Sequence, residues 1–248
     1  MNRKKYSSQK KIFSFLILFA LASNLSSDIE DNIALHKEQF SEVALKIWEY
    51  AELGYQETKS SNLLASELEK EGFKITKGVA GIPTAFVAEF GSSGPVIGIL
   101  GEFDALPGLA QTNSPFKEVA INDSGGGHAC GHHLFGAASA WAAVSIKEWL
   151  VANDIDGTVR FYGTPAEEGG SGKVYMVREG LFDDVDVVLH WHPDDVNSAN
   201  PKTSNSNKSA KFTFKGISAH AAGSPELGRS ALDGVEAMNM MVNMMREH

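Results

Sequence analysis

The stretch GGGHACGHHLFGAASA, residues 125–140, holds the only cysteine of the chain together with three of its eight histidines. These residues, His128, Cys130, His132 and His133, fall within six consecutive positions. Thiolate and imidazole groups are the donors that zinc and related metals prefer, whereas a hydrophobic core has little use for so many titratable side chains in one turn. The spacing therefore predicts a metal site around Cys130.

Carboxylates and further histidines follow three apolar segments elsewhere in the chain. GEFDALP follows VIGIL, TPAEEGG follows TVRFYG, and LHWHP ends VDVVL. In an open α/β sheet, functional side chains gather beyond the carboxyl ends of the strands, so we expect these segments to meet near Cys130. Their candidate donors are Glu102, Asp104, Glu167, Glu168, His190 and His192.

Each segment also has a purely structural interpretation. A strand-end aspartate often caps a turn, adjacent glutamates are usually solvated, and a single cysteine packs as a small apolar residue. Taken one at a time, these interpretations are favoured over the functional ones. The repeated placement of donor residues directly after strands favours a shared site instead.

The mixture of donors indicates which metal chemistry to expect. Sulfur, nitrogen and oxygen ligands suit a zinc-like ion, with Mn²⁺ or Co²⁺ where oxygen dominates. A catalytic ion keeps a position for water and lowers the pKa of that water to about 7. Consecutive side chains point apart, so one of the adjacent Glu167 and Glu168 can bind metal while the other accepts the proton.

Alternating helical and strand-like segments predict an α/β layer fold with a largely parallel sheet. Helical spacing predicts one helix from residue 31 to about 51, a second ending near Gly72, and a long helix of small residues beginning near Gly131. Strands are expected in FKITKGV, TAFVAEF, VIGILG, TVRFYGT and VDVVLHW, and a further helix in SGKVYMVREGLF.

A polar run rich in Ser and Asn, residues 194–209, is typical of a linker. Beyond it come an alternating strand pattern at residues 210–216, a loop that holds His220, and a methionine-rich helix. We expect a catalytic domain over residues 23–205 and the start of a second domain over residues 206–248.

The first 22 residues have the pattern of a signal peptide. Five basic residues precede an apolar run at residues 12–22 that ends in small residues, and an uncleaved N-terminal anchor is the alternative. We therefore expect an exported protein, periplasmic or secreted, with no other membrane segment. The net charge of −9 argues against a nucleic-acid partner.

The motifs GHACGHH, TPAEEGG, LHWHP and AHAAGSPELGRSALDGVEAMNMM occur in this order. In this combination the chain resembles the co-catalytic metallopeptidase superfamily of aminoacylases and carboxypeptidase-G-type enzymes. The resemblance is strongest to the amidohydrolase branch that contains the aminobenzoyl-glutamate utilization protein B group. It implies a zinc-exopeptidase-like, three-layer α/β catalytic domain with an inserted α+β lid and dimerisation domain.

The resemblance also implies a reaction. Two divalent metal ions, Zn²⁺ or Mn²⁺, would activate water to cleave the amide bond of a dipeptide or of an N-acyl or N-aroyl amino acid, such as aminobenzoyl-glutamate. The protein would be a homodimer at full length. Relatives of this kind continue past the lid and supply one more histidine ligand, so we expect these 248 residues to be an N-terminal fragment that is inactive alone.

Site roles follow from the same resemblance, position by position. Cys130 would bridge the two metals as a thiolate, and His132 would bind one of them. Glu167 would be the general base and Glu168 a metal ligand. Asp104 would orient a ligand imidazole from behind.

For the remaining histidines the resemblance leaves some roles open. His192 is the favoured ligand of the HWHP motif, with His190 as the close alternative. His133 stands where many relatives carry Asp or Asn, and its role stays open between an extra ligand, an outer donor and neither. His220 matches the lid histidine that reaches a partner subunit's active site and stabilises the oxyanion.

Two other function classes remain. A cysteine hydrolase would use Cys130 as nucleophile and a nearby histidine as base, but it leaves the Glu167 and Glu168 pair unexplained. A non-catalytic, truncated product would bind metal, substrate or a partner without turnover.

Overall fold

The computed structural model describes residues 30, 32–122, 124–199, 203 and 205–247. The chain divides into two compact units between Val196 and Asn197, inside the polar run at residues 194–209. The expected signal peptide at residues 1–22 lies outside the described residues. Within the part that is described, no helix is both long enough and apolar enough to cross a membrane.

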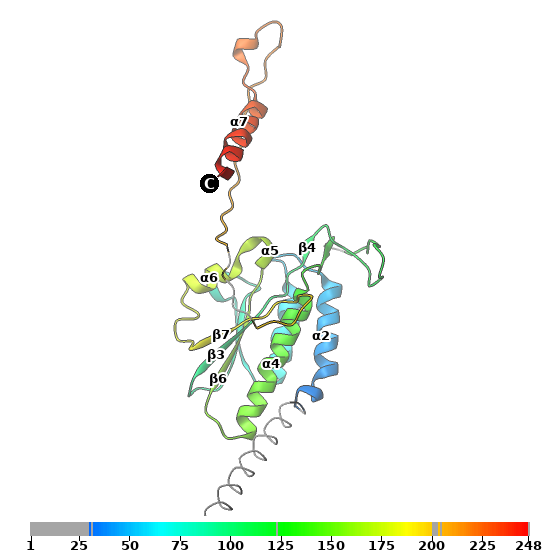
Figure 1. The fold of residues 1–248 in the computed structure, drawn as a ribbon, viewed down its shortest axis with the longest axis vertical. Coiled ribbons are helices and arrows are strands. Elements are labelled where there is room, and N and C mark those ends of the chain that lie inside the picture. The colour runs from blue at the N-terminus through cyan, green and yellow to red at the C-terminus, as the bar shows by residue number, and fades with distance from the viewer. Residues whose placement is uncertain (1–29, 31, 123, 200–202, 204, 248) are drawn as a thin grey trace, which may run out of the picture. The chain divides into compact units, whose positions relative to one another are not determined.

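A five-stranded sheet forms the centre of the first unit (Figure 1), with the strand order β1-β2-β6-β3-β7. The strands are β1 (Lys74–Lys77), β2 (Phe86–Phe90), β3 (Val96–Gly101), β6 (Thr158–Gly163) and β7 (Val187–Leu189). β3 pairs in parallel with β6 and β7, whereas β2 pairs antiparallel with β1 and β6. Four strands therefore run in one direction and β2 runs against them, which confirms the α/β fold class and makes the sheet mixed.

Three helices cover one face of this sheet and supply most of the core. They are α2 (Lys37–Tyr50), α3 (Thr58–Lys70) and α4 (His132–Ala152). α2 buries Phe40, Val43 and Ile47, whose spacing places them on one side of the helix. α3 and α4 pack directly on the strands, and α2 packs on both of these helices.

Two shorter helices follow β6, and the segment after them packs on the opposite face of the sheet. They are α5 (Glu167–Gly170) and α6 (Gly172–Arg178). Successive side chains of a strand point to opposite faces, so Phe161 enters the core under α4 while Tyr162 points to the other side. There the Tyr162 ring lies 4.4 Å from that of Phe182, and its hydroxyl donates to the backbone oxygen of Leu181. The remaining short elements of the first unit are η1 (Val79–Gly81), β4 (Leu106–Pro107) and β5 (Gly126–Gly127).

The second unit holds helical segments rather than the expected strand. Its elements are η2 (Pro225–Leu227), α7 (Ala231–Met244) and η3 (Met245–Glu247). The strand predicted at residues 210–216 is wrong for this structure, because the described part of the unit gives it no neighbouring strand to pair with. The methionine-rich helix is present as α7, and Met240, Met241 and Met244 are exposed on it.

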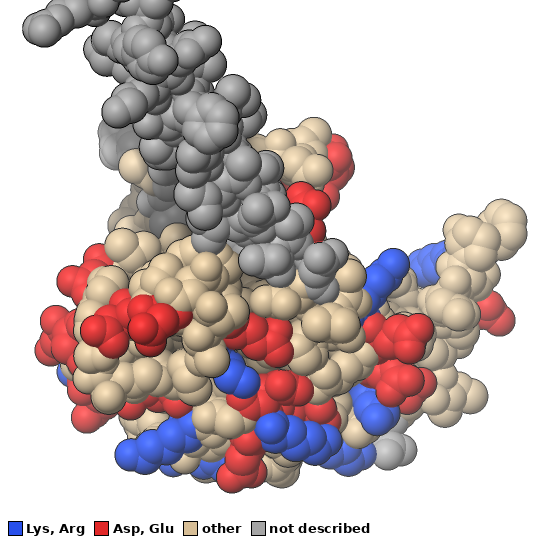
Figure 2. Space-filling model, turned by 90° about the horizontal axis from the view of Figure 1, so that it is seen from below, with Lys and Arg blue, Asp and Glu red and all other residues tan. Residues whose placement is uncertain are grey.

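Charged side chains of both signs mix on the molecular surface. On the face drawn in Figure 2, Lys and Arg side chains lie among Asp and Glu side chains. A nucleic acid is held by a continuous basic surface, which this face does not present.

One ionic contact ties the start of α2 to the end of α4. Nε2 of His36 lies 2.8 Å from a carboxylate oxygen of Glu148, and Nδ1 lies 3.1 Å from the side-chain oxygen of Gln39. Burial alone lowers the pKa of His36, but the hydrogen bonds to Glu148 and Gln39 and the charges of Glu148 and Glu71 outweigh it and raise the pKa. The protonated form of His36 is therefore favoured by folding.

Stability should respond to pH through His36. Because the folded pKa is raised above the unfolded value of about 6.5, the stabilisation is fully present below that value and is lost as pH rises through the folded pKa. We expect His36→Ala to lower the unfolding free energy of the full-length protein by about 1 kcal/mol more at pH 6 than at pH 9. Urea denaturation at both pH values measures this difference. A loss of the same size at both values would contradict the ionic role.

Candidate metal centre

His132 lies at the centre of the site, as the first residue of α4, and is completely buried. Its Nδ1 lies 3.0 Å from the backbone oxygen of Asp104 and 3.0 Å from Oδ1 of the same residue. Both atoms are acceptors, so Nδ1 carries the ring hydrogen. Nε2 is then the atom that a metal can bind, in place of a second proton.

Four carboxylates lie around the His132 ring. Besides Asp104, the Nε2 atom lies 2.9 Å from Oε2 of Glu102, 3.9 Å from Oε2 of Glu167 and 4.0 Å from Oε1 of Glu168. Buried acceptors normally have a hydrogen-bond partner, yet Nε2 of His132, Oε2 of Glu102 and Oε1 of Glu168 have none among the described residues. Converging acceptors without donors fit a site built for cations.

A second group of donors approaches His132 from the other side. Sγ of Cys130 lies 3.4 Å from Nε2 of His192, and the His132 and His192 rings lie 5.6 Å apart. Nδ1 of His192 donates to the backbone oxygen of Pro193, which leaves Nε2 as the ring atom available to a metal. Gly131 permits this approach, since a Cβ at its φ of 77° would lie 2.8 Å from Pro193.

These donors form two overlapping groups of potential ligands that share His132. One group is Cys130, His132 and His192, and the other is Glu102, His132 and Glu167. Sulfur and nitrogen dominate the first group, which suits Zn²⁺, and oxygen dominates the second, which suits Zn²⁺ or Mn²⁺. The donor set of the described residues therefore fits the two metal ions that the family resemblance implies.

The carboxylates of the site favour the binding of positive charge. Burial, together with the nearby Glu168 and Glu167, raises the pKa of the Cys130 thiol to about 11. Burial lowers the pKa of His132, but Asp104 and Glu102 outweigh it and raise that pKa to about 10. A thiolate at neutral pH therefore needs a bound cation beside it.

The two glutamates of the TPAEEGG motif differ in exposure. The side chain of Glu167 is 45% exposed, whereas that of Glu168 is 19% exposed and has one buried oxygen. A base must face substrate and a ligand must face the metal, so exposure supports the predicted roles. The distances between donor atoms favour the opposite assignment, because Glu167, and not Glu168, is close enough to Glu102 and His132 to share a metal ion with them. Both assignments stay predictions.

Three of the histidines discussed above lie outside these ligand groups. The His190 ring packs edge-on against Phe135, with centroids 5.1 Å apart, and belongs to neither group of described donors. His133 packs against His128, also at 5.1 Å, and the side chain of His128 donates to the backbone oxygen of Ile47. Burial lowers the pKa of both His128 and His133 to about 4. The neutral form of both rings is therefore favoured, and the role of His133 stays open.

His220 lies in the second unit, in an exposed loop before η2. Its Nδ1 accepts hydrogen bonds from the backbone N–H groups of Gly223, at 2.9 Å, and Ala222, at 3.2 Å. The ring hydrogen is therefore on Nε2, the state needed to donate to an oxyanion. Its role there stays a prediction.

Glu57 is a site residue that the sequence analysis does not single out. It is completely buried, its Oε1 accepts from the backbone N–H of Ala166 at 2.8 Å, and its Oε2 accepts from the Thr84 hydroxyl at 2.9 Å. Ala166 directly precedes Glu167 and adopts a left-handed conformation with φ of 56°, which is costly for a residue with a side chain. Glu57 therefore holds the strained turn that presents Glu167 and Glu168.

Removal of this support should misplace the glutamates. In the full-length protein, we expect Glu57→Ala to lower kcat by about 100-fold, the effect of a displacement near 1 Å at a catalytic group. Glu57→Gln should keep most activity, because its amide can accept from Ala166 and donate to Thr84. Steady-state kinetics of both variants measure this. Equal loss in both would mean that charge, not hydrogen bonding, is what Glu57 contributes.

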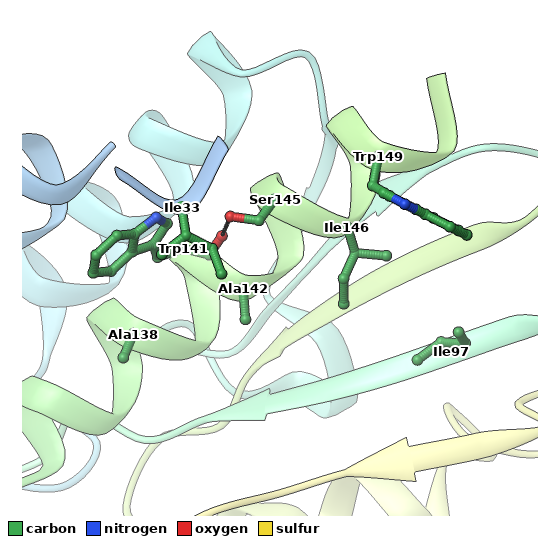
Figure 3. A pocket seen from close by; sticks show the side chains of 8 residues that line it. All are labelled: Ile33, Ile97, Ala138, Trp141, Ala142, Ser145, Ile146 and Trp149. Carbon is green, nitrogen blue, oxygen red and sulfur yellow. Dashed lines mark hydrogen bonds between the residues drawn. The ribbon is translucent and has the colours of Figure 1, made fainter. Parts of the chain in front are cut away.

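An apolar groove of about 480 Å³ lies on the same helix, away from these donors. Figure 3 shows Trp141, Ile146 and Trp149 along α4, with Ile97 on β3 below them. The candidate donor His132 lies at the N-terminal end of α4, whereas the groove follows the middle and C-terminal part of that helix. The lining offers no carboxylate, imidazole or thiol, so the groove is not a second metal centre.

The chain matches one family of known proteins and is similar to several of its members. Residues 98–232 match peptidase family M20/M25/M40. The chain is 47% identical over 220 residues to one of the subunits of p-aminobenzoyl-glutamate hydrolase from Escherichia coli (strain K12), a match that covers 89% of this chain and 46% of that protein. It is 32% identical over 156 residues to hippurate hydrolase of Campylobacter jejuni, covering 62% of this chain and 39% of that protein.

A solved structure is similar as well. A dinuclear metal-binding peptidase of the M20 family from Bacillus subtilis has a TM-score of 0.54 and 32% sequence identity, covering 65% of this chain and 44% of that chain. The chain thus spans less than half the length of each of these three relatives.

Proposed function

This chain belongs to peptidase family M20/M25/M40, and we propose that the whole protein uses metal-activated water to hydrolyse the amide bond of an N-acyl or N-aroyl amino acid or a dipeptide. The observation that carries the proposal is the convergence of unpartnered, buried donor atoms of Glu102, His132 and Glu168 beside Cys130. Two relatives named for N-aroyl amino acids, p-aminobenzoyl-glutamate and hippurate, favour an aroyl substrate.

Each side chain has a part in this reaction. Cys130, His132, Glu168 and His192 would hold two divalent ions, Zn²⁺ or Mn²⁺, which supply a Lewis acid and lower the pKa of water. Glu167 accepts the proton of that water and passes it to the leaving amine. Asp104 fixes the ring of His132 through Nδ1 and, through Oδ2, accepts the backbone N–H of Glu168 at 3.0 Å. One carboxylate therefore orients two ligands.

The cysteine-hydrolase hypothesis is less favourable. A nucleophilic thiol needs a lowered pKa, usually from a neighbouring cation. Burial and the nearby carboxylates instead raise the pKa of Cys130 to about 11. The same surroundings suit a thiolate that is bound to metal.

Metal dependence tests the proposal. The full-length protein should hydrolyse p-aminobenzoyl-glutamate, hippurate or a dipeptide, should lose this activity after treatment with EDTA, and should regain it with Zn²⁺ or Mn²⁺. Turnover that resists the chelator but stops with iodoacetamide would support thiol attack instead. Absence of turnover on all three substrates, with metal bound, would support the non-catalytic hypothesis.

Export and dimerisation belong to the same proposal. The pattern of residues 1–22 supports export to the periplasm or the medium, and N-terminal sequencing of the mature protein tests it. The exposed methionines of α7 support a subunit interface in the full-length homodimer. Light scattering of the full-length protein measures that state.

A further inference from the structure

Glu102 is an almost completely buried carboxylate that faces the metal centre, and the roles implied by the family resemblance do not include it. It follows β3 directly, it is 2% exposed, and its Oε2 lies 2.9 Å from Nε2 of His132. Gly136 makes this proximity attainable, because a Cβ there would lie 2.6 Å from the backbone oxygen of Glu102. Close packing of α4 on the end of β3 therefore brings the two side chains together.

Glu102 and His132 lie within ion-pair distance of each other, but the described atoms form no hydrogen bond between them. Nδ1 of His132 holds the ring hydrogen toward Asp104, and both Nε2 and Oε2 of Glu102 are without a hydrogen-bond partner in the described part of the chain. An imidazole nitrogen and a carboxylate oxygen this close need a positive charge between them, which is either a proton on Nε2 or a metal ion in its place. Consider two ligand atoms that each lie about 2.1 Å from one ion, in directions at right angles to each other. Such atoms are about 3 Å apart, which matches the 2.9 Å between Nε2 of His132 and Oε2 of Glu102.

Lys173 determines how Glu102 can bind. Its ammonium group on α6 is ion-paired with Oε1 of Glu102, the oxygen that points away from His132. One carboxylate oxygen is thus held by the lysine and the other remains for a metal. The lysine also offsets part of the negative charge of the four carboxylates that surround the His132 ring.

We propose that Glu102 is an additional metal ligand in the centre formed by Cys130 and His132, and that Lys173 restricts it to one oxygen. This inference rests on the proposed function, since it concerns the same metal centre. It adds an oxygen donor and a fixed positive charge to the cysteine, histidine and glutamate ligands expected from the sequence.

Binding of Co²⁺ to the chelator-treated, full-length protein tests the inference without reference to turnover. Visible absorption of Co²⁺ reports both affinity and the number of ligands. We expect Glu102→Gln to weaken Co²⁺ binding by at least 10- to 100-fold, roughly the range caused by loss of an outer partner of a ligand, and to change the spectrum. Lys173→Met is the companion variant: it keeps the carboxylate and frees its second oxygen, so it should bind Co²⁺ at least as tightly as the unaltered protein and with a changed spectrum, and an unchanged spectrum would contradict the role of the lysine.

The double variant Glu102→Gln/Lys173→Met distinguishes the loss of a metal ligand from the effect of a Lys173 ammonium group left without its carboxylate. It removes both partners of the ion pair, so it leaves no unpaired ammonium group, and it should bind Co²⁺ as weakly as Glu102→Gln. Unchanged affinity and spectrum in Glu102→Gln would overturn the inference, and so would normal affinity in the double variant. If the proposed function itself fails, the unaltered protein will bind no Co²⁺ and show no chelator-sensitive hydrolysis.

Discussion

Glu167→Gln should leave the full-length protein with its metal and almost none of its activity. General-base catalysis contributes about 10²–10⁴-fold, so we expect kcat to fall by that factor while KM changes little. The amide has the shape of the carboxylate but cannot accept a proton. The exposure of the Glu167 side chain, 45%, is what a group that meets both water and substrate requires. Steady-state kinetics and metal analysis on one preparation measure both quantities.

Glu168→Gln is the matched control for this experiment. Its carboxylate is more buried and has an oxygen without a partner beside His132, so the same substitution there should lower the bound metal as well as the activity. If Glu167→Gln loses metal and Glu168→Gln keeps it, the roles of the two residues are exchanged. That result would agree with the grouping of Glu167 with Glu102 and His132.

The sequence predicts the convergence of these residues because of how parallel strands end. Neighbouring strands β6, β3 and β7 run in one direction, so the segments after them meet at one edge of the sheet. Asp104, Glu167 and His192 each follow one of these strands. Strand patterns and motif order were therefore sufficient to predict the fold class and most of the candidate donors.

Contacts that depend on long-range packing were beyond such patterns. Glu57 and Ala166 are 109 residues apart, and Glu102 and Lys173 are 71 apart. No local periodicity links either pair, and a glutamate in a loop looks solvated until the fold buries it. The antiparallel direction of β2 likewise depends on which strands it pairs with, which the local sequence does not specify. The strand expected at residues 210–216 failed for a related reason, since alternation predicts a strand only where a partner strand is present.

Cys130→Ser should lower activity by more than 100-fold, with the loss arising from metal binding. A neutral hydroxyl is a far weaker ligand than a thiolate, and loss of a direct ligand should exceed the 10- to 100-fold effect of losing its outer partner. The remaining donors, His132 and His192 among them, stay in place. High Zn²⁺ or Mn²⁺ concentrations should therefore restore part of the activity.

Rescue by metal is the decisive feature of the Cys130→Ser experiment. A nucleophilic cysteine forms a bond to the substrate, so excess metal could not replace it. The surroundings of Cys130 already oppose that role, because they stabilise the neutral thiol and raise its pKa. Only a cation close to the sulfur reverses this preference. Full metal content in Cys130→Ser, with no turnover at any metal concentration, would show that the sulfur reacts rather than binds.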